Sequence, residues 1–432
     1  MKELTDLSAV TAAGLIAKRE ISAVELTTAF LDRIEQRNPS VRAFRHIDPE
    51  FSLAEAAKAD QSSVRSSLHG VPFAIKDVID TADFPTEYGT PIHAGHRPSA
   101  DARCVSLMRD AGAIPLGKLV TTEYAMFTPN ETRHPLDPAR TPGGSSSGTG
   151  AAVGDRMVPI AFGNQTAGSL IRPAAYCGTF GLKPTHGTTD GTGILPLQPF
   201  FDTLGYVSNE IGDIQAFYSI VSGLDRTKTW PANRTPKIGV CETYQWSFAE
   251  QETRDALSAT ADQLSTSGCH VEALRLPEDY ADLVAVHRRV LYAGIAKSLD
   301  KDYQHRRQLM SARLLEIIAE GRATSTAEYD HALAFAEQCR ETVNEACFGD
   351  FDAIICPSTP GIAPQGYETG LPIFQVSWTL LGVPCLNLPV ATGPHNMPVG
   401  VQLVGKRHHD ADLLALGKRL MEDFQHIELA VS

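Results

Sequence analysis

The chain has few of the features that mark secreted or membrane proteins. Its eight cysteines include no Cys-x-x-Cys pair, and several stand in apolar runs, which predicts buried thiols in a reducing compartment. No apolar run approaches the ~18–20 residues of a membrane span. The opening residues, MKELTDLSAV, lack a basic stretch followed by an apolar one, so no secretion signal is predicted. We expect a cytoplasmic protein with no membrane partner.

Positive charge is also scarce. The chain carries 38 Lys and Arg against 51 Asp and Glu, which gives a formal net charge of −13. Such a balance opposes non-specific attraction to phosphate backbones and anionic lipids. We therefore expect no nucleic-acid partner.

Clusters of metal ligands are missing as well. His93 with His96, and His408 with its neighbours His409 and Asp410, come nearest, but neither group forms a helical His-x-x-x-His pair with a clear third ligand. The glycine cluster at 191–196 is not followed by the Lys-Ser/Thr of a nucleotide loop. We expect neither a metal nor a cofactor.

The order of elements predicts an α/β protein with a central sheet, because strand patterns alternate with helical ones. Residues 8–37 indicate two amphipathic helices, the second with a capping box from Ser22 and Glu25 and an end at Pro39. No linker divides the 432 residues, so one domain over 1–432 is expected. Further strands are predicted at 72–78, 114–119, 237–241, 270–276, 352–358, 385–390 and 399–405, and mostly helix at 278–348.

Residues 141–185 are the most informative stretch, and they are poor in bulky side chains. They hold two serines among glycines, Ser145 in GGSSSG and Ser169 in TAGS. Such a stretch makes a poor core strand and a poor helix. A nucleophile beside exposed backbone N–H groups would explain it, and the N–H groups of Thr166, Ala167, Gly168 and Ser169 could receive a developing oxyanion.

These blocks resemble the amidase signature family of serine amide hydrolases. The similarity includes GGSSSG, GNQTAGS, RPAAYCG and GLKPT, and extends to HGVPFAIKDVID at 69–80, PLGKLVTTEYA at 115–125, FDTLG at 201–205 and the segment 377–405. The resemblance implies a single α/β/α sandwich around a large mixed sheet. It is weakest at 225–350, where it implies a variable helical region that covers the active-site cleft. It also implies a possible homodimer.

A serine hydroxyl needs a base, and no histidine stands near either serine in the sequence. The resemblance implies that Ser169 is the nucleophile, Ser145 the relay after a cis Gly144–Ser145 bond, and Lys76 the base. Desolvation on an apolar strand would lower the pKa of Lys76 and favour its neutral amine. A surface position or a pair with Asp77 is the structural alternative for Lys76, and Lys183 is a rival lysine.

Three supporting residues, Ser146, Gln165 and Arg172, are expected near this triad. The chain departs from the common family pattern here: many members have Asp at the position of Gln165, Gly at that of Ala167, and Arg one residue earlier than Arg172. The Arg- and His-rich face at 287–307 indicates a solvated helix face, or alternatively a site for a substrate carboxylate.

The resemblance implies hydrolysis of the C–N bond of a small-molecule amide through an acyl-enzyme. Two alternatives use the same site: an esterase or urea-type (carbamoyl) hydrolase, and the glutaminase subunit of a tRNA-dependent amidotransferase. The length and the acidic charge argue against that subunit. A catalytically silent binding protein is the remaining alternative, and the intact positions 76, 145 and 169 argue against it.

Overall fold

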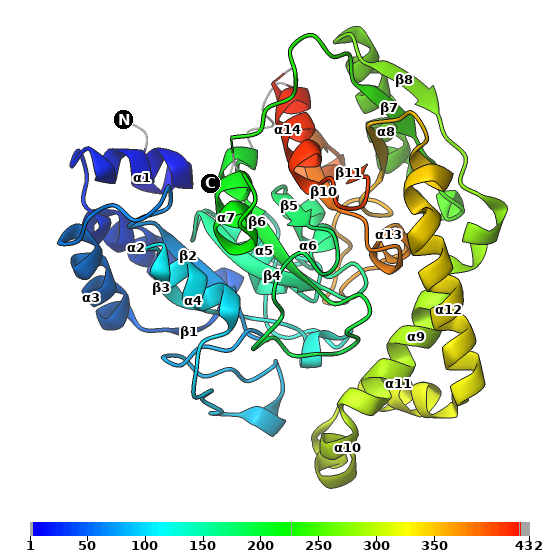
Figure 1. Cartoon of the computed structure of the whole chain (residues 1–432). Helices are drawn as coiled ribbons and strands as arrows, with labels where there is room; N and C mark the ends of the chain where they lie inside the picture. Colours follow the sequence, from blue (N-terminus) through cyan, green and yellow to red (C-terminus); the bar gives the residue numbers. More distant parts are fainter. Residues whose placement is uncertain (1–2, 226, 423, 425–432) are drawn as a thin grey trace.

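The computed structural model describes residues 3–225, 227–422 and 424, and a single mixed sheet runs through them (Figure 1). The 11 strands lie in the order β1-β3-β2-β4-β6-β5-β10-β11-β9-β7-β8, with parallel pairs near both ends and antiparallel pairs between them. The strands are β1 (Phe44–Ile47), β2 (Pro72–Lys76), β3 (Ile114–Leu119), β4 (Ile160–Gln165), β5 (Phe180–Lys183), β6 (Thr203–Ser208), β7 (Lys237–Val240), β8 (His270–Ala273), β9 (Ala353–Pro357), β10 (Cys385–Thr392) and β11 (Pro398–Gly405).

Helices cover both faces of this sheet. They are α1 (Ala9–Ala17), α2 (Ala23–Val41), α3 (Pro49–Asp60), α4 (Arg103–Asp110), α5 (Ser147–Gly154), α6 (Ile171–Tyr176), α7 (Ile211–Ser222), α8 (Gln251–Thr266), α9 (Leu283–Ser298), α10 (Asp300–Arg306), α11 (Ala312–Ala323), α12 (Thr326–Val343), α13 (Val376–Leu380) and α14 (Asp410–Met421).

Alternating side chains of the central strands enter two separate apolar cores. Phe73 and Ile75 of β2 lie in the core that also contains Phe217 of α7. Ala74 lies in the core that contains Phe30 of α2. Since successive strand residues point to opposite faces, the sheet must lie between two helical layers. The predicted α/β/α sandwich with a large mixed sheet is confirmed.

Most predicted elements are present, and one predicted boundary is wrong. The capping box of Ser22 and Glu25 starts α2 as expected, but Pro39 does not end the helix. Pro39 lies in the last turn, and the helix continues to Val41 because its end is set by Arg42, whose backbone is left-handed with φ 54°. Strands β1, β5 and β6 were not predicted, since each is only four to six residues long and lacks a polar–apolar alternation.

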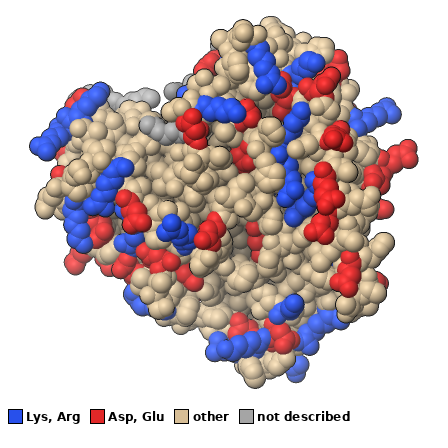
Figure 2. All heavy atoms as spheres, viewed as in Figure 1, with Lys and Arg blue, Asp and Glu red and all other residues tan. Residues whose placement is uncertain are grey.

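The helical region predicted at 278–348 is confirmed. Helices α9, α11 and α12 pack on one another and extend away from the sheet toward α10 in Figure 1. Within the described ranges, no helix is long and apolar enough to cross a membrane. Seven of the cysteines are buried, and Cys269 is partly exposed. On the face shown in Figure 2, basic side chains are scattered among acidic ones.

A buried carboxylate joins α2 to the end of α5. Asp155 is fully buried and lies 2.6 Å from the Arg33 Nη2 atom and 2.8 Å from the Arg37 Nε atom. Burial raises the pKa of Asp155, and the two guanidinium groups oppose that rise. The carboxylate is therefore stable in its charged form only while both arginines are present.

Replacing this carboxylate should destabilise the fold. Asp155→Ala leaves two arginines without their buried partner, and we expect the free energy of unfolding to fall by about 3 kcal/mol. Glu316→Ala, which removes a partner from the exposed pair with Arg313, should change it by less than about 0.5 kcal/mol. Urea unfolding measures both, and equal losses in the two variants would contradict the assignment.

Candidate active site

The structure brings Lys76 and Ser145 into direct contact. Lys76 ends β2 with its side chain fully buried, and its Nζ atom lies 2.7 Å from the Ser145 Oγ atom and 2.6 Å from the Asn164 Oδ1 atom. The Asn164 Oδ1 atom can only accept, so one Lys76 N–H group is directed toward it. A proton shared by Lys76 and Ser145 can then lie on either partner, depending on the charge of the amine. The Gly144–Ser145 peptide bond is cis, as the resemblance implies.

Burial is the main reason that the pKa of Lys76 lies well below its ordinary value. The nearby charge of Arg172 lowers this pKa further, whereas the carboxylate of Asp202 raises it. An amine with a depressed pKa is neutral for a larger part of the pH range and can accept a proton. The desolvation argument made from the sequence is thus supported by the buried position of the side chain.

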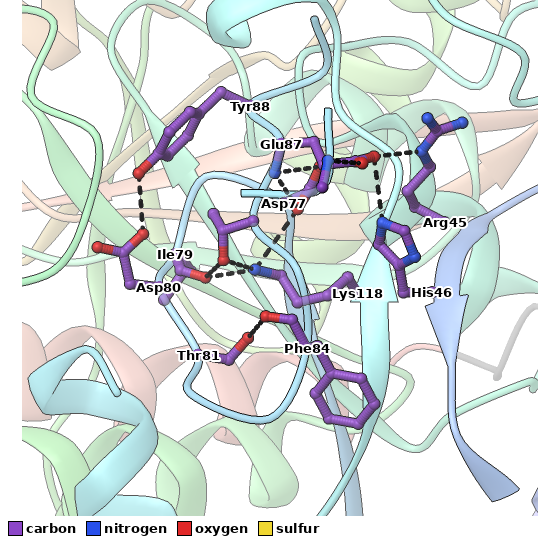
Figure 3. Close-up of polar contacts among 12 residues, drawn as sticks. Arg45, His46, Asp77, Ile79, Asp80, Thr81, Phe84, Glu87, Tyr88 and Lys118 are labelled. Atoms are coloured by element: carbon purple, nitrogen blue, oxygen red, sulfur yellow. Dashed lines mark hydrogen bonds and ion pairs between the residues drawn. The ribbon is translucent and has the colours of Figure 1, made fainter. Parts of the chain in front are cut away.

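Two other lysines are equally buried, but their contacts differ (Figure 3). Lys118 lies 3.4 Å from the Asp77 carboxylate and donates to the Ile79 carbonyl and the Thr86 hydroxyl, while burial lowers its pKa to about 8. The Lys183 Nζ atom donates to the carbonyl of Pro184. Of the three, it is Lys76 whose amine contacts a serine hydroxyl. Asp77 pairs with Lys118, so the predicted alternative of a Lys76–Asp77 pair is wrong.

The two serine loops lie side by side. The backbone N–H of Ser146 donates to the carbonyl oxygen of Ser169 at 3.0 Å, and the Ser146 hydroxyl donates to the carbonyl of Asn164 at 3.3 Å. Ser145 is 1% exposed and Ser169 7%, so Ser169 is the more accessible of the two hydroxyls. Ser146 therefore connects the two loops through its backbone and its side chain.

Gln165 fixes the turn that carries Ser169. Its Oε1 atom accepts the N–H groups of Leu170 and Ile171, both at 3.0 Å, where α6 begins. Its Nε2 group donates to the Thr379 hydroxyl at 2.9 Å, and that hydroxyl donates to the Ala167 carbonyl at 2.7 Å. A neutral amide thus closes the loop by donating at one end and accepting at the other.

Thr166 is held from the opposite side. Its hydroxyl donates to the Asp202 carboxylate at 2.7 Å, and its carbonyl lies 2.8 Å from the Nε2 atom of His287 in α9. Asp202 belongs to the FDTLG block, which gave a signal in the sequence without a role. His287 gave none, because the 287–307 segment was expected to be a solvated face, and for this buried residue that expectation is wrong.

The N–H groups of Ala167, Gly168 and Ser169 donate to no acceptor in the described part of the chain. Gly168 is packed tightly: a Cβ atom there would lie 2.7 Å from the Gln375 Oε1 atom and 2.8 Å from the Pro372 Cβ atom. Gln375 is fully buried. The loop therefore combines backbone donors that can bind a further acceptor with a position that has no room for a side chain.

Arg172 connects three loops. Its buried guanidinium donates to the carbonyl of Gly144 through Nε at 3.2 Å and Nη2 at 2.5 Å, and to the carbonyl of Gly370 through Nη1 at 2.7 Å. The sequence could not predict this orientation, because its arginine is offset by one residue from the common family pattern. The contacts show that it anchors the residue immediately before Ser145.

Asn164 was missed by sequence reasoning, although it lies in the GNQTAGS block and contacts Lys76 directly. Thr379 was missed as well, since it comes from a segment more than two hundred residues away. In residues 3–225, 227–422 and 424, no group of three or more His, Cys, Asp or Glu side chains could hold a metal ion. The predicted triad, by contrast, lies on segments that the fold places together.

Comparisons with known proteins agree with this geometry. A glutamyl-tRNA(Gln) amidotransferase subunit of Solidesulfovibrio magneticus is 31% identical over 477 residues, which span 97% of each chain. The corresponding subunit of Myxococcus xanthus is 30% identical and covers 96% of this chain and 97% of its own.

Solved structures extend the similarity to the whole fold. A crystal structure of an amidase, 27% identical, superposes with a TM-score of 0.90 over 97% of this chain and 100% of its own. The peptide amidase of Stenotrophomonas maltophilia, 25% identical, superposes with a TM-score of 0.81 over 97% of both chains. A family model for amidases matches residues 25–414. The chain therefore belongs to the amidase signature family.

Proposed function

We propose that the protein hydrolyses the C–N bond of a small-molecule amide through an acyl-enzyme on Ser169. The observation that carries this proposal is the 2.7 Å contact between the buried Lys76 amine and the Ser145 hydroxyl, beside the loop that bears Ser169. A serine becomes a nucleophile only when a base removes its proton, and a desolvated amine can do so.

The proton path follows from these positions. Neutral Lys76 takes the proton of Ser145, Ser145 takes that of Ser169, and the Ser169 oxygen attacks the carbonyl carbon. Ser145 then returns a proton to the departing nitrogen as the C–N bond breaks. Water repeats the same steps on the ester, which releases the acid and restores the three side chains. This route uses no metal and no cofactor.

The oxyanion is held by backbone donors. We assign this role to the N–H groups of the Thr166–Ser169 turn, since those of Ala167, Gly168 and Ser169 have no acceptor in the described chain. Donors that are fixed before the reaction stabilise the developing charge most effectively. Gln165 and Arg172 support this arrangement by holding the ends of the two serine loops.

The helical region at 225–350 covers the cleft in this proposal. Besides the contact of His287 with Thr166, Asp302 of α10 accepts from the Tyr124 hydroxyl at 2.7 Å and lies 2.9 Å from His93. The backbone N–H of Ser311 donates to Glu123 at 3.0 Å. The region therefore contacts the loops on both sides of the site.

A second candidate is the glutaminase subunit of a tRNA-dependent amidotransferase. The curated relatives that match almost the full length of the chain are subunits of such an enzyme, which supports this candidate more directly than any particular small amide. The chemistry at Ser169 would be the same, with glutamine as the amide and a partner protein as the receiver of ammonia. Esters and ureas are further substrates that the same site could cleave.

A substrate screen tests the function. Small primary amides, anilides, ureas, matched esters and L-glutamine are each incubated with the native protein, and turnover is expected for one class of amide. Ser169→Ala and Lys76→Met should each lower kcat by at least about 10³-fold, because triad members act as a unit. Lys183→Met removes a buried lysine outside the site and should leave turnover intact.

A fluorophosphonate should label Ser169 in the native protein, and mass spectrometry identifies the modified residue. Glutamine hydrolysis that requires a partner protein would favour the amidotransferase candidate. Turnover of no amide and no ester, together with an unlabelled Ser169, would refute the proposal.

Activity should depend on pH through Lys76. Its amine must be neutral to act as a base, so kcat/KM should rise as pH rises through the depressed pKa of Lys76 and then level off. Asp202 raises this pKa, so Asp202→Asn should move the acidic limb of the profile to lower pH. Glu316→Gln is the control, and a limb that stays fixed or moves upward in Asp202→Asn would contradict the assignment of the base.

The oxyanion loop should not tolerate a side chain at Gly168. In Gly168→Ala, the new Cβ atom would meet Gln375 and Pro372 below 3.0 Å, so the loop must shift and its donors lose alignment. Misplacing one such donor costs about 10²–10³-fold in kcat. Gly191→Ala is the matched control, since a Cβ atom there meets nothing within 4 Å. Equal activity of both variants would exclude Gly168 from the loop's function.

A further inference from the structure

One buried histidine of the helical region contacts the turn before Ser169. His287 of α9 is 3% exposed, and its Nε2 atom lies 2.8 Å from the Thr166 carbonyl oxygen. A carbonyl oxygen only accepts, so the proton of the ring must reside on Nε2. Burial lowers the pKa of His287 to about 4, which keeps the ring neutral near pH 7. The imidazole stacks on Phe201 with the ring centroids 4.5 Å apart and the planes 21° apart.

This contact determines where a neighbouring donor points. In a planar trans peptide the C=O group and the N–H group of the next residue point in opposite directions. When His287 holds the Thr166 carbonyl on one side, the N–H of Ala167 is directed to the other. That N–H group has no acceptor in the described part of the chain.

The next peptide repeats the arrangement. The Thr379 hydroxyl holds the Ala167 carbonyl at 2.7 Å, so the N–H of Gly168 is directed away from Thr379. Two consecutive carbonyl groups are therefore held by side chains from α9 and α13, and the two N–H groups that follow them are fixed in direction.

We propose that His287 is a positioning residue, which orients the Ala167 N–H toward the oxyanion by donating its Nε2–H to the Thr166 carbonyl. This inference rests on the proposed acyl transfer at Ser169 and assigns a residue of the helical region to it. His287 does not contact the reacting atoms. Its contribution is realised in the transition state, when negative charge develops next to the Ala167 N–H.

Helix α9 has a second attachment that does not involve the imidazole. The Gln198 Nε2 group donates to the Val290 carbonyl at 2.8 Å and lies 3.2 Å from the Tyr329 hydroxyl. Replacing His287 should therefore leave α9 docked, and the loss of the donor can be separated from the loss of the helix.

Two variants of nearly equal shape test the donor. His287→Gln keeps an N–H group at the place of Nε2, and His287→Met fills the same volume without one. We expect kcat of the Met variant to fall about 10- to 100-fold with KM changed less than about threefold, a smaller effect than removing a direct oxyanion donor. The Gln variant should keep kcat within about threefold of the native protein.

The labelling rate of a fluorophosphonate gives an independent readout, since its phosphoryl oxygen occupies the place of the oxyanion. It should fall in the Met variant and be restored in the Gln variant, while urea unfolding of the two variants stays equal. If the Met variant does not fold, His287→Phe replaces it, since the phenyl ring keeps the stacking on Phe201 without a donor.

Equal kcat and equal labelling in the Gln variant and in the variant without a donor would overturn the inference. If the native protein labels at Ser169 and turns over an amide in that case, the proposed function stands and the role of His287 alone fails. A native protein that does neither overturns both.

Discussion

The chemistry of this protein depends on one amine that is buried without an ion pair. Lys76 is fully enclosed, and its nitrogen contacts a serine hydroxyl and an asparagine oxygen instead of a carboxylate. The carboxylate adjacent in sequence, Asp77, is engaged by Lys118. If Asp77 were free to pair with Lys76, it would favour the ammonium form and raise the pKa that burial lowers. The pairing of Lys118 thus protects the basicity of its neighbour.

The loop around Ser169 is fixed by contacts from outside it. Gln165 holds its two ends, Thr379 and His287 hold two of its carbonyl groups, and Arg172 holds the residue before Ser145. The loop consists of small residues and cannot stabilise itself by packing. Its backbone donors keep their direction because side chains from distant parts of the chain hold the carbonyl groups.

Much of the fold and of the site could be predicted from the sequence. Strand β2 was recognisable because Phe73, Ala74 and Ile75 are apolar, and the serine loops because small residues gather there. The family resemblance then identified Lys76 among several lysines. What could not be predicted depends on contacts that only the folded chain brings about: the contact of Asn164 with Lys76, the contact of Thr379 with Ala167, and the orientation of Arg172.

Short elements and helix ends were the other source of error. Strand β5 has four residues and pairs with β10 and β6 in the middle of the sheet, so its identity depends on its neighbours more than on its own pattern. Helix α2 passes through Pro39, since its end depends on the backbone of Arg42. His287 was misjudged because one charged helix segment can contain both a solvated arginine and a buried imidazole.

The attachment of α9 to Thr166 has a consequence for the evolution of such enzymes. The segment in which the family resemblance is weakest, and which would be exchanged to fit new substrates, also carries a hydrogen bond to the turn that precedes Ser169. Grafting a foreign helical segment onto this scaffold would transfer or remove that bond together with the new lining. Selectivity and turnover rate are therefore coupled traits here, and engineers cannot vary the first while leaving the second untouched.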